Sequence, residues 1–211
     1  MRTIRFAILV LAAAGLSLAQ QWEIGAGAGA GFLPGVAVTS PFGAATTGFQ
    51  SGAAFGAHLG QNLYPHLSGE VHYGFMQSNL RLQSGSTTAT FSGVAHVVHY
   101  DLVLHTSRRG SRTQLFVAAG GGLKIFRGTG KEAAYQPLSQ FGYFTKTQEL
   151  KPMADFGGGV KFQLGPRVFL RTEFRDYLTV FPEEIIAPPD RVKFGKMLHD
   201  FVPMVGISYE Y

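Results

Sequence analysis

Residues 168–177, VFLRTEFRDY, decide the fold because their side chains alternate in character with a period of two. One face carries Val168, Leu170, Thr172 and Phe174, and the other carries Phe169, Arg171, Glu173 and Arg175. A strand points successive side chains to opposite faces, so this stretch predicts a β-strand with one apolar face and one charged face. The segment Gly165-Pro166-Arg167 just before it predicts a tight turn.

Seven other stretches alternate in the same way and predict further strands, at residues 22–32, 55–60, 67–75, 94–104, 115–125, 154–164 and 201–211. The links between strands alternate in length. Short links are expected at 62–66, 107–113 and 165–167, and long ones at 34–52, 77–88, 127–150 and 181–198. An even number of strands of about ten residues, with short periplasmic turns and longer outer loops, is typical of outer-membrane barrels. The sequence therefore predicts an all-β fold, an eight-stranded antiparallel up-and-down transmembrane β-barrel.

The composition agrees with a barrel surrounded by lipid. Only 15% of the 211 residues are charged, against about 25% in an ordinary soluble domain, so little water-facing surface is expected. The absence of cysteine excludes a disulfide scaffold, a thiolate metal site and a cysteine nucleophile. A soluble barrel with an apolar ligand cavity is the alternative. However, its polar faces would then face water, and here they are mostly Gly, Ala and Ser with too few charged side chains for that role. Aliphatic and aromatic side chains are therefore assigned to lipid-facing rows, and glycines to the lumen.

Aromatic residues near the strand ends are expected to form the interfacial girdles of such a barrel. They are Trp22, Phe32, Tyr64, Phe75, Phe162, Phe174, Tyr209 and Tyr211.

The N-terminus predicts export. Arg2 and Arg5 precede an apolar run at 6–18 that ends in small residues, as in a secretory signal peptide cleaved after Ala19. The alternative is a membrane anchor, but the run is shorter than the roughly 20 residues that a transmembrane helix needs. The expected organisation is a signal peptide at 1–19 and a barrel domain at 20–211. Cleavage removes Arg2 and Arg5, which lowers the formal charge from +5 to +3, so nucleic acid is not an expected partner.

The charged faces predict a polar network in the lumen. An eight-stranded barrel has room only for side chains inside, so inward charges must pair across it while glycines relieve crowding. The predicted network consists of Glu70, His72, His99, Asp101, Asp155, Lys161, Arg171, Glu173 and Arg175. His58 and His105 also fall on lumen faces. No HExxH motif is present, and His96 and His99 point to opposite faces, so the histidines are expected to hydrogen-bond rather than hold a metal.

The chain resembles the OmpA/OmpX-type family of small outer-membrane β-barrels, from about residue 21 to residue 211. Gly206, Tyr209 and the terminal aromatic Tyr211 resemble the C-terminal insertion signal that the family's assembly machinery reads, and the strand at 169–177 resembles its strands with inward Arg and Glu. The resemblance implies a Gram-negative outer-membrane location, with periplasmic chaperones and the barrel assembly machinery as partners during biogenesis. It carries over no catalytic residue. Because the chain ends at the last strand, no appended peptidoglycan-binding domain is expected.

Function is expected in the outer loops, since binding residues tend to lie on loops held by a rigid scaffold. Basic residues flank two of the long loops and are candidate contacts for the phosphates of lipopolysaccharide: Arg127, Lys131, Lys146 and Lys151 at one loop, and above all Arg191, Lys193 and Lys196 at another. Solvated loop charges are the alternative interpretation.

The prediction is a non-enzymatic, monomeric envelope protein without cofactor, metal or catalytic residue, serving envelope structure or surface contact. Two alternatives remain. One is a narrow porin-like channel. The other is a lipid-modifying enzyme, for which His66 and Ser68 lie beside a periplasmic turn, the wrong end for such chemistry.

Overall fold

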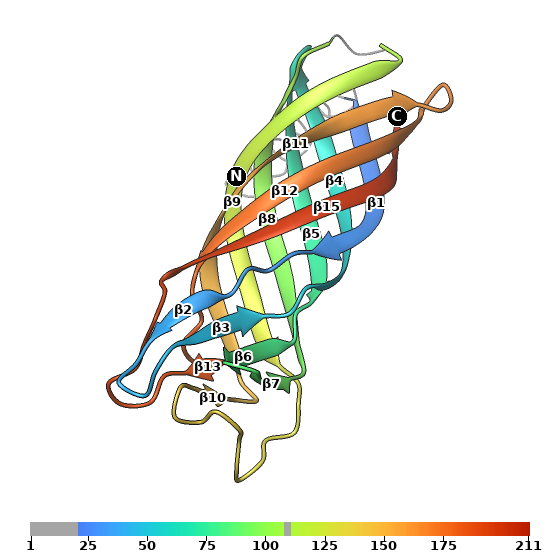
Figure 1. Cartoon of the computed structure of the whole chain (residues 1–211). Coiled ribbons are helices and arrows are strands. Elements are labelled where there is room, and N and C mark those ends of the chain that lie inside the picture. The colour runs from blue at the N-terminus through green and yellow to red at the C-terminus, as the bar shows by residue number, and fades with distance from the viewer. Residues whose placement is uncertain (1–20, 108–110) are drawn as a thin grey trace, which may run out of the picture.

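The structure is a computed structural model that describes residues 21–107 and 111–211, so the predicted signal peptide lies outside the described residues. Every predicted strand is present, and all eight belong to one closed antiparallel barrel (Figure 1). The barrel strands are β1 (Trp22–Gly31), β4 (Gly52–Tyr64), β5 (Leu67–Gln77), β8 (Gly93–His105), β9 (Thr113–Gly128), β11 (Gln148–Gln163), β12 (Val168–Val180) and β15 (Met197–Glu210). The described residues include no helix long and apolar enough to cross a membrane.

The barrel closes because its first and last strands pair. Strand β1 runs antiparallel to β15, with Ile24 opposite Tyr209 and Gly27 opposite Gly206. The other neighbours follow in chain order, which confirms the up-and-down topology, and closure leaves no sheet edge in the wall. The links at 65–66, 106–112 and 164–167 define the turn end of the barrel, and those at 32–51, 78–92, 129–147 and 181–196 define its loop end, which is drawn at the bottom of Figure 1.

The two faces of each barrel strand differ as the alternation predicts. On β12, Arg171 and Arg175 are buried in the lumen, whereas Phe174 between them is half exposed on the outside. The other strands repeat this pattern, with Val98, Tyr100, Leu102 and Leu104 exposed along the outside of β8. An apolar outer surface around a polar interior is the pattern of a barrel that sits in lipid.

Glycine allows the wall to curve tightly in β9. A Cβ built on Gly122 would lie 2.0 Å from the carbonyl oxygen of Val98 and 2.5 Å from the Cα of His99, both on the neighbouring strand β8. These are backbone atoms that cannot move aside without breaking the strand pairing. Glycine is therefore required there by close approach between strands, as expected where a small barrel bends.

At the loop end, the long links that the sequence predicts as outer loops contain regular structure. The long links contain seven short strands, which we call the loop-end cap together with the residues that connect them. A five-stranded sheet has the order β14 (Lys193–Phe194), β2 (Val36–Thr39), β3 (Ala45–Phe49), β6 (Leu80–Ser84), β7 (Thr87–Phe91), and β10 (Tyr143–Phe144) pairs with β13 (Ile186–Ala187). These strands have two to five residues, too few for a period of two to stand out in the sequence.

A hydrophobic core lies beneath the cap and continues into the loop end of the lumen. Phe49 from β3 stacks on Phe126 from β9 with ring centroids 5.1 Å apart, and Phe181 meets Phe194 edge-on at 5.1 Å. The largest fully buried apolar side chains of this core are Phe126, Phe181, Leu80, Leu82, Ile185, Ile186 and Leu198. The assignment of aliphatic and aromatic residues to lipid-facing rows was therefore wrong for this set, which fills the inside of the molecule.

Candidate functional site

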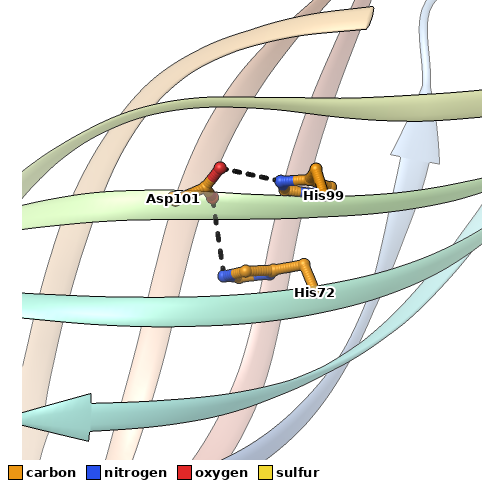
Figure 2. Close-up of side chains that lie close together, drawn as sticks. All are labelled: His72, His99 and Asp101. Atoms are coloured by element: carbon orange, nitrogen blue, oxygen red, sulfur yellow. Dashed lines mark hydrogen bonds and ion pairs between the residues drawn. The ribbon is translucent and has the colours of Figure 1, made fainter. Parts of the chain in front are cut away.

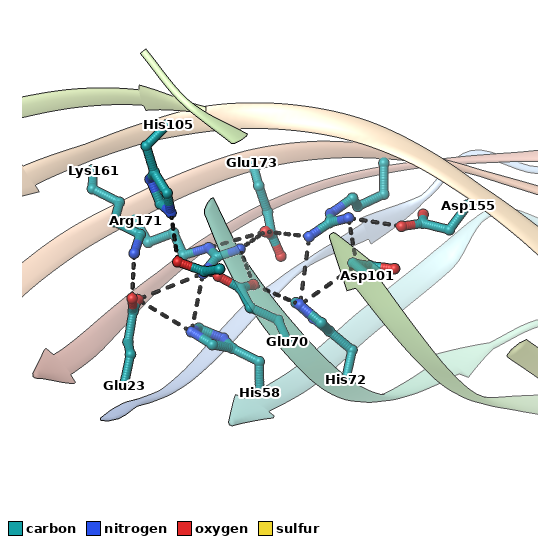
Figure 3. A network of polar contacts seen from close by, with 12 residues as sticks. Glu23, His58, Glu70, His72, Asp101, His105, Asp155, Lys161, Arg171 and Glu173 are labelled. Atoms are coloured by element: carbon teal, nitrogen blue, oxygen red, sulfur yellow. Dashed lines mark hydrogen bonds and ion pairs between the residues drawn. The ribbon is translucent and has the colours of Figure 1, made fainter. Parts of the chain in front are cut away.

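Arg171 is the centre of the polar network in the turn-end half of the lumen (Figure 3). It projects inward from β12 and reaches Glu70 on β5, across the lumen, through two parallel contacts of 2.7 and 3.1 Å. The same guanidinium contacts Glu173 at 3.0 Å and lies 4.6 Å above the ring of Phe116. Such a bidentate pair fixes the relative position of two strands that are not neighbours in the barrel.

Arg175 forms the second centre, two inward positions farther along β12, beyond Glu173. Its Nη1 donates to Asp101 on β8 and to Asp155 on β11, both at 2.7 Å. All three side chains are fully buried. His99 Nδ1 lies 2.8 Å from the other oxygen of Asp101, so Asp101 is held from two sides.

A third group closes the network toward the turn end. Lys161 of β11 forms an ion pair with Glu23 of β1, and Glu23 also lies 3.4 Å from His58 Nε2. His58 in turn contacts Arg171 at 3.1 Å, and Glu173 joins Arg171 to Arg175, whose Nη2 donates to it at 3.4 Å, so the three groups are continuous.

Every residue of the predicted network points into the lumen, and contacts connect them into this single cluster. The prediction omits Glu23, Lys124 and Asp200, although alternation places all three on lumen faces. Lys124 and Asp200 form a fully buried ion pair across the lumen, nearer the loop end. The missed signal was simply their charge at inward positions of strands that otherwise carry glycine and apolar residues.

His72, His99 and Asp101 form the one group of possible metal ligands in the described part of the chain (Figure 2). Their ligand atoms lie within 4.8 Å of one another. However, the two imidazoles are stacked, with centroids 4.8 Å apart and planes 14° from parallel. Because each nitrogen lone pair lies in its ring plane, stacked rings cannot aim at one ion at the roughly 2 Å that ligation requires. Arg175 already supplies a positive charge to Asp101. This geometry fits hydrogen bonding better than metal binding.

A serine–histidine contact that the sequence did not suggest lies near the turn end. Ser68 Oγ is 3.1 Å from His105 Nε2, and both residues are buried. The hydroxyl of Ser68 donates to Asn62 Oδ1 at 2.8 Å, so its single proton is not directed at the imidazole. In the described residues the other nitrogen, His105 Nδ1, has no partner to orient the ring. The pair therefore lacks both the proton geometry and the third group of a hydrolytic triad.

The lumen is filled rather than open. A cavity of about 30 Å³ lies against His58, His72, Arg171 and Glu173, which is room for about two water molecules. Toward the loop end, the apolar side chains of Val97, Phe126, Met153, Leu198 and Val202 fill the interior below the cap. Ion pairs therefore fill the turn-end half of the lumen, and apolar side chains fill the loop-end half.

The predicted loop residues and the two C-terminal tyrosines lie on the surface, whereas Gly206 lies on the inward face of its strand. Arg191, Lys193 and Lys196 are exposed at the loop end, and Lys193 pairs with Thr39 at the edge of the cap sheet. Gly206 and Tyr209 lie on β15, and the rings of Tyr209 and Tyr211 contact each other on the outside with centroids 5.6 Å apart. His66 lies at the turn next to Ser68, and its Nδ1 contacts the backbone oxygen of His105 at 3.0 Å.

A closed eight-stranded antiparallel barrel with an apolar outside, a charged interior and short turns at one end defines the small outer-membrane type of barrel. Solved structures of that type are similar to this chain. Neisserial surface protein A has 12% identity, with 90% of this chain and 97% of that chain covered and a TM-score of 0.54. The N-terminal β-barrel domain of Pseudomonas aeruginosa OprF has 14% identity, 90% and 97% coverage and a TM-score of 0.50. The outer membrane protein AlkL has 13% identity, 90% coverage of both chains and a TM-score of 0.50.

At these identities the likeness concerns the fold. No protein-family model matches the sequence, and no curated protein matches it.

Proposed function

We propose that this protein is an integral outer-membrane barrel of the OmpA/OmpX type, without enzymatic activity, whose loop-end cap makes contacts at the cell surface. The observation that carries the proposal is the combination of a filled lumen with a cap that has its own sheet and core. A filled lumen supports neither passage of solutes nor a substrate site inside. An ordered cap is a rigid platform for binding, which open loops are not.

The partners proposed for this role follow from the location. Lipid and lipopolysaccharide surround the waist of the monomer, and the exposed Arg191, Lys193 and Lys196 contact lipopolysaccharide phosphates. Export depends on the signal peptide at 1–19, and insertion depends on chaperones and the assembly machinery acting on the C-terminal strand. Of the solved neighbours, the Neisserial protein is described as a surface protein, which agrees with a role of this kind.

The orientation can be tested by cysteine labelling, because the natural chain has no cysteine. Tyr135→Cys places a thiol in the cap at a residue that is 80% exposed, and Arg167→Cys places one in an exposed turn at the opposite end. In intact cells a membrane-impermeant maleimide is expected to label Tyr135→Cys and not Arg167→Cys, while both react after lysis. Labelling of Arg167→Cys alone in intact cells would show the opposite orientation. Labelling of neither variant would show that the cap is not accessible at the cell surface.

The filled lumen also predicts the electrical behaviour of the purified protein. Reconstituted into planar bilayers, the folded barrel is expected to give no discrete channel openings, because ion pairs and apolar side chains occupy its cross-section. A porin reconstituted in the same way provides the positive control. The protein is first shown to be folded by its different gel migration before and after heating. Reproducible unitary openings from such folded protein would contradict the proposal and favour the narrow channel.

A further inference from the structure

Besides the basic triad at 191–196, the loop end has a second basic site, a groove in the outer wall where β9 ends and β11 begins. The groove has a volume of about 350 Å³ and is lined by Arg127, Gly128, Thr129, Lys146, Thr147 and Gln148. Arg127 and Gln148 lie directly opposite each other in the strand register. The lining is rich in hydrogen-bond donors and contains no carboxylate.

The groove lies immediately beyond the apolar outer surface. The next outward pair toward the turn end is Ile125 with Leu150, and the one after it is Leu123 with Pro152. Leu123 and Leu150 are about half exposed on the outside of the barrel. A lipid whose acyl chain lies along these side chains would therefore carry its headgroup at the level of Arg127.

The two cations of the groove are available for a ligand. Among residues 21–107 and 111–211, neither the Arg127 guanidinium nor the Lys146 ammonium forms an ion pair, and both side chains are exposed. The carboxylate of Glu132 lies nearby, but it accepts a hydrogen bond from the backbone N–H of Lys146, at 2.5 Å. In contrast, Lys193 of the basic triad lies in the cap sheet rather than on a barrel strand, so it does not continue an outward apolar row.

From this juxtaposition we infer that Arg127 and Lys146 bind the phosphate group of a membrane lipid in the leaflet at the loop end. Arginine and lysine are suited to this task, because guanidinium pairs with two phosphate oxygens and ammonium supplies a point charge. The hydroxyls of Thr129 and Thr147 and the amide of Gln148 add donors at the same site. The inference rests on the proposed function for the membrane around the barrel, but it assigns a site that the basic triad does not include.

The test is lipid retention. The protein is reconstituted in vesicles of phosphatidylcholine doped with phosphatidic acid, whose headgroup is a phosphate monoester, then extracted in mild detergent, and bound lipids are quantified by native mass spectrometry. The wild-type protein is expected to retain phosphatidic acid in excess over its share of the vesicle. The double variant Arg127→Gln/Lys146→Gln is expected to lose this preference by about tenfold or more, since two charge-assisted contacts are removed.

Two controls make the result specific. The triple variant Arg191→Gln/Lys193→Gln/Lys196→Gln removes more charge at the same end and is expected to keep the preference. Excess inorganic phosphate during extraction is expected not to displace the lipid, because it lacks the acyl contacts.

Equal retention by the wild-type protein and the double variant would overturn the site, as would loss of retention in the triple variant alone. Displacement by free phosphate would overturn the assignment to a lipid. All variants are first verified as folded by the difference in gel migration between unheated and heated samples. Each of these failures would therefore leave the proposed surface role standing.

Discussion

Replacing Arg175 by methionine is expected to lower the free energy of unfolding by about 3–5 kcal/mol, because two buried carboxylates lose their shared cation. Asp101 and Asp155 both accept a hydrogen bond from Arg175 Nη1, and neither side chain has contact with solvent. Methionine fills much of the same volume but supplies no donor. The measurement is urea unfolding in vesicles, followed by the fluorescence of Trp22, the single tryptophan of the chain.

A rescue variant separates the loss of charge compensation from a loss of packing. Adding Asp101→Asn and Asp155→Asn to Arg175→Met removes both uncompensated charges at nearly constant volume, so most of the lost stability is expected to return. Arg167→Met, at an exposed turn, is the matched control and should change the unfolding free energy by less than about 0.5 kcal/mol. An Arg175→Met barrel as stable as the wild-type protein would mean that the network does not hold the strands together.

Lys124→Met is expected to destabilise the barrel by a similar amount, about 3–5 kcal/mol, because it leaves Asp200 buried without a cation. Lys124 and Asp200 form an ion pair with no further hydrogen bond found in the described residues, and both are fully buried. Their surroundings are apolar, with the Lys124 ammonium 4.6 Å from the ring centroid of Phe126. Removing the lysine leaves a lone carboxylate in this environment.

The double variant Lys124→Met/Asp200→Leu is expected to recover the stability of the wild-type protein or exceed it, since replacing a buried ion pair by apolar residues is often neutral or stabilising. The same urea titration measures both variants, and Lys193→Met at the exposed cap edge serves as control. If the double variant is no more stable than Lys124→Met, the pair contributes a specific geometry that hydrocarbon cannot replace.

The glycine-rich strands and the network residues could be predicted because alternation is a local property. Whether Glu70 or Arg171 points inward depends only on its parity along its own strand, so a single sequence reveals it. The number of strands and the lengths of their links then led to a closed barrel. For the same reason the inward positions of Glu23, Lys124 and Asp200 could be read from the sequence, although their importance was missed.

The partners of these residues depend on the tertiary structure. Arg175 contacts Asp101, although their strands are not neighbours in the barrel. The two side chains meet only if they lie at the same height along the barrel axis. That height depends on the strand register around the whole wall. The cap and its core depend on the same long-range geometry, since Phe49, Phe126 and Phe194 come from segments far apart in the chain.

The groove of Arg127 and Lys146 also exists only where two strand ends lie side by side. By itself the sequence determined the strands and their faces, because side-chain alternation is set within each strand, and the number of strands predicted a barrel; the direct pairing of β1 with β15 came from the structure. The tertiary structure alone decided which charges meet, which apolar residues turn inward and where two cations converge beside the lipid, because those contacts join residues that only the register of the barrel brings together.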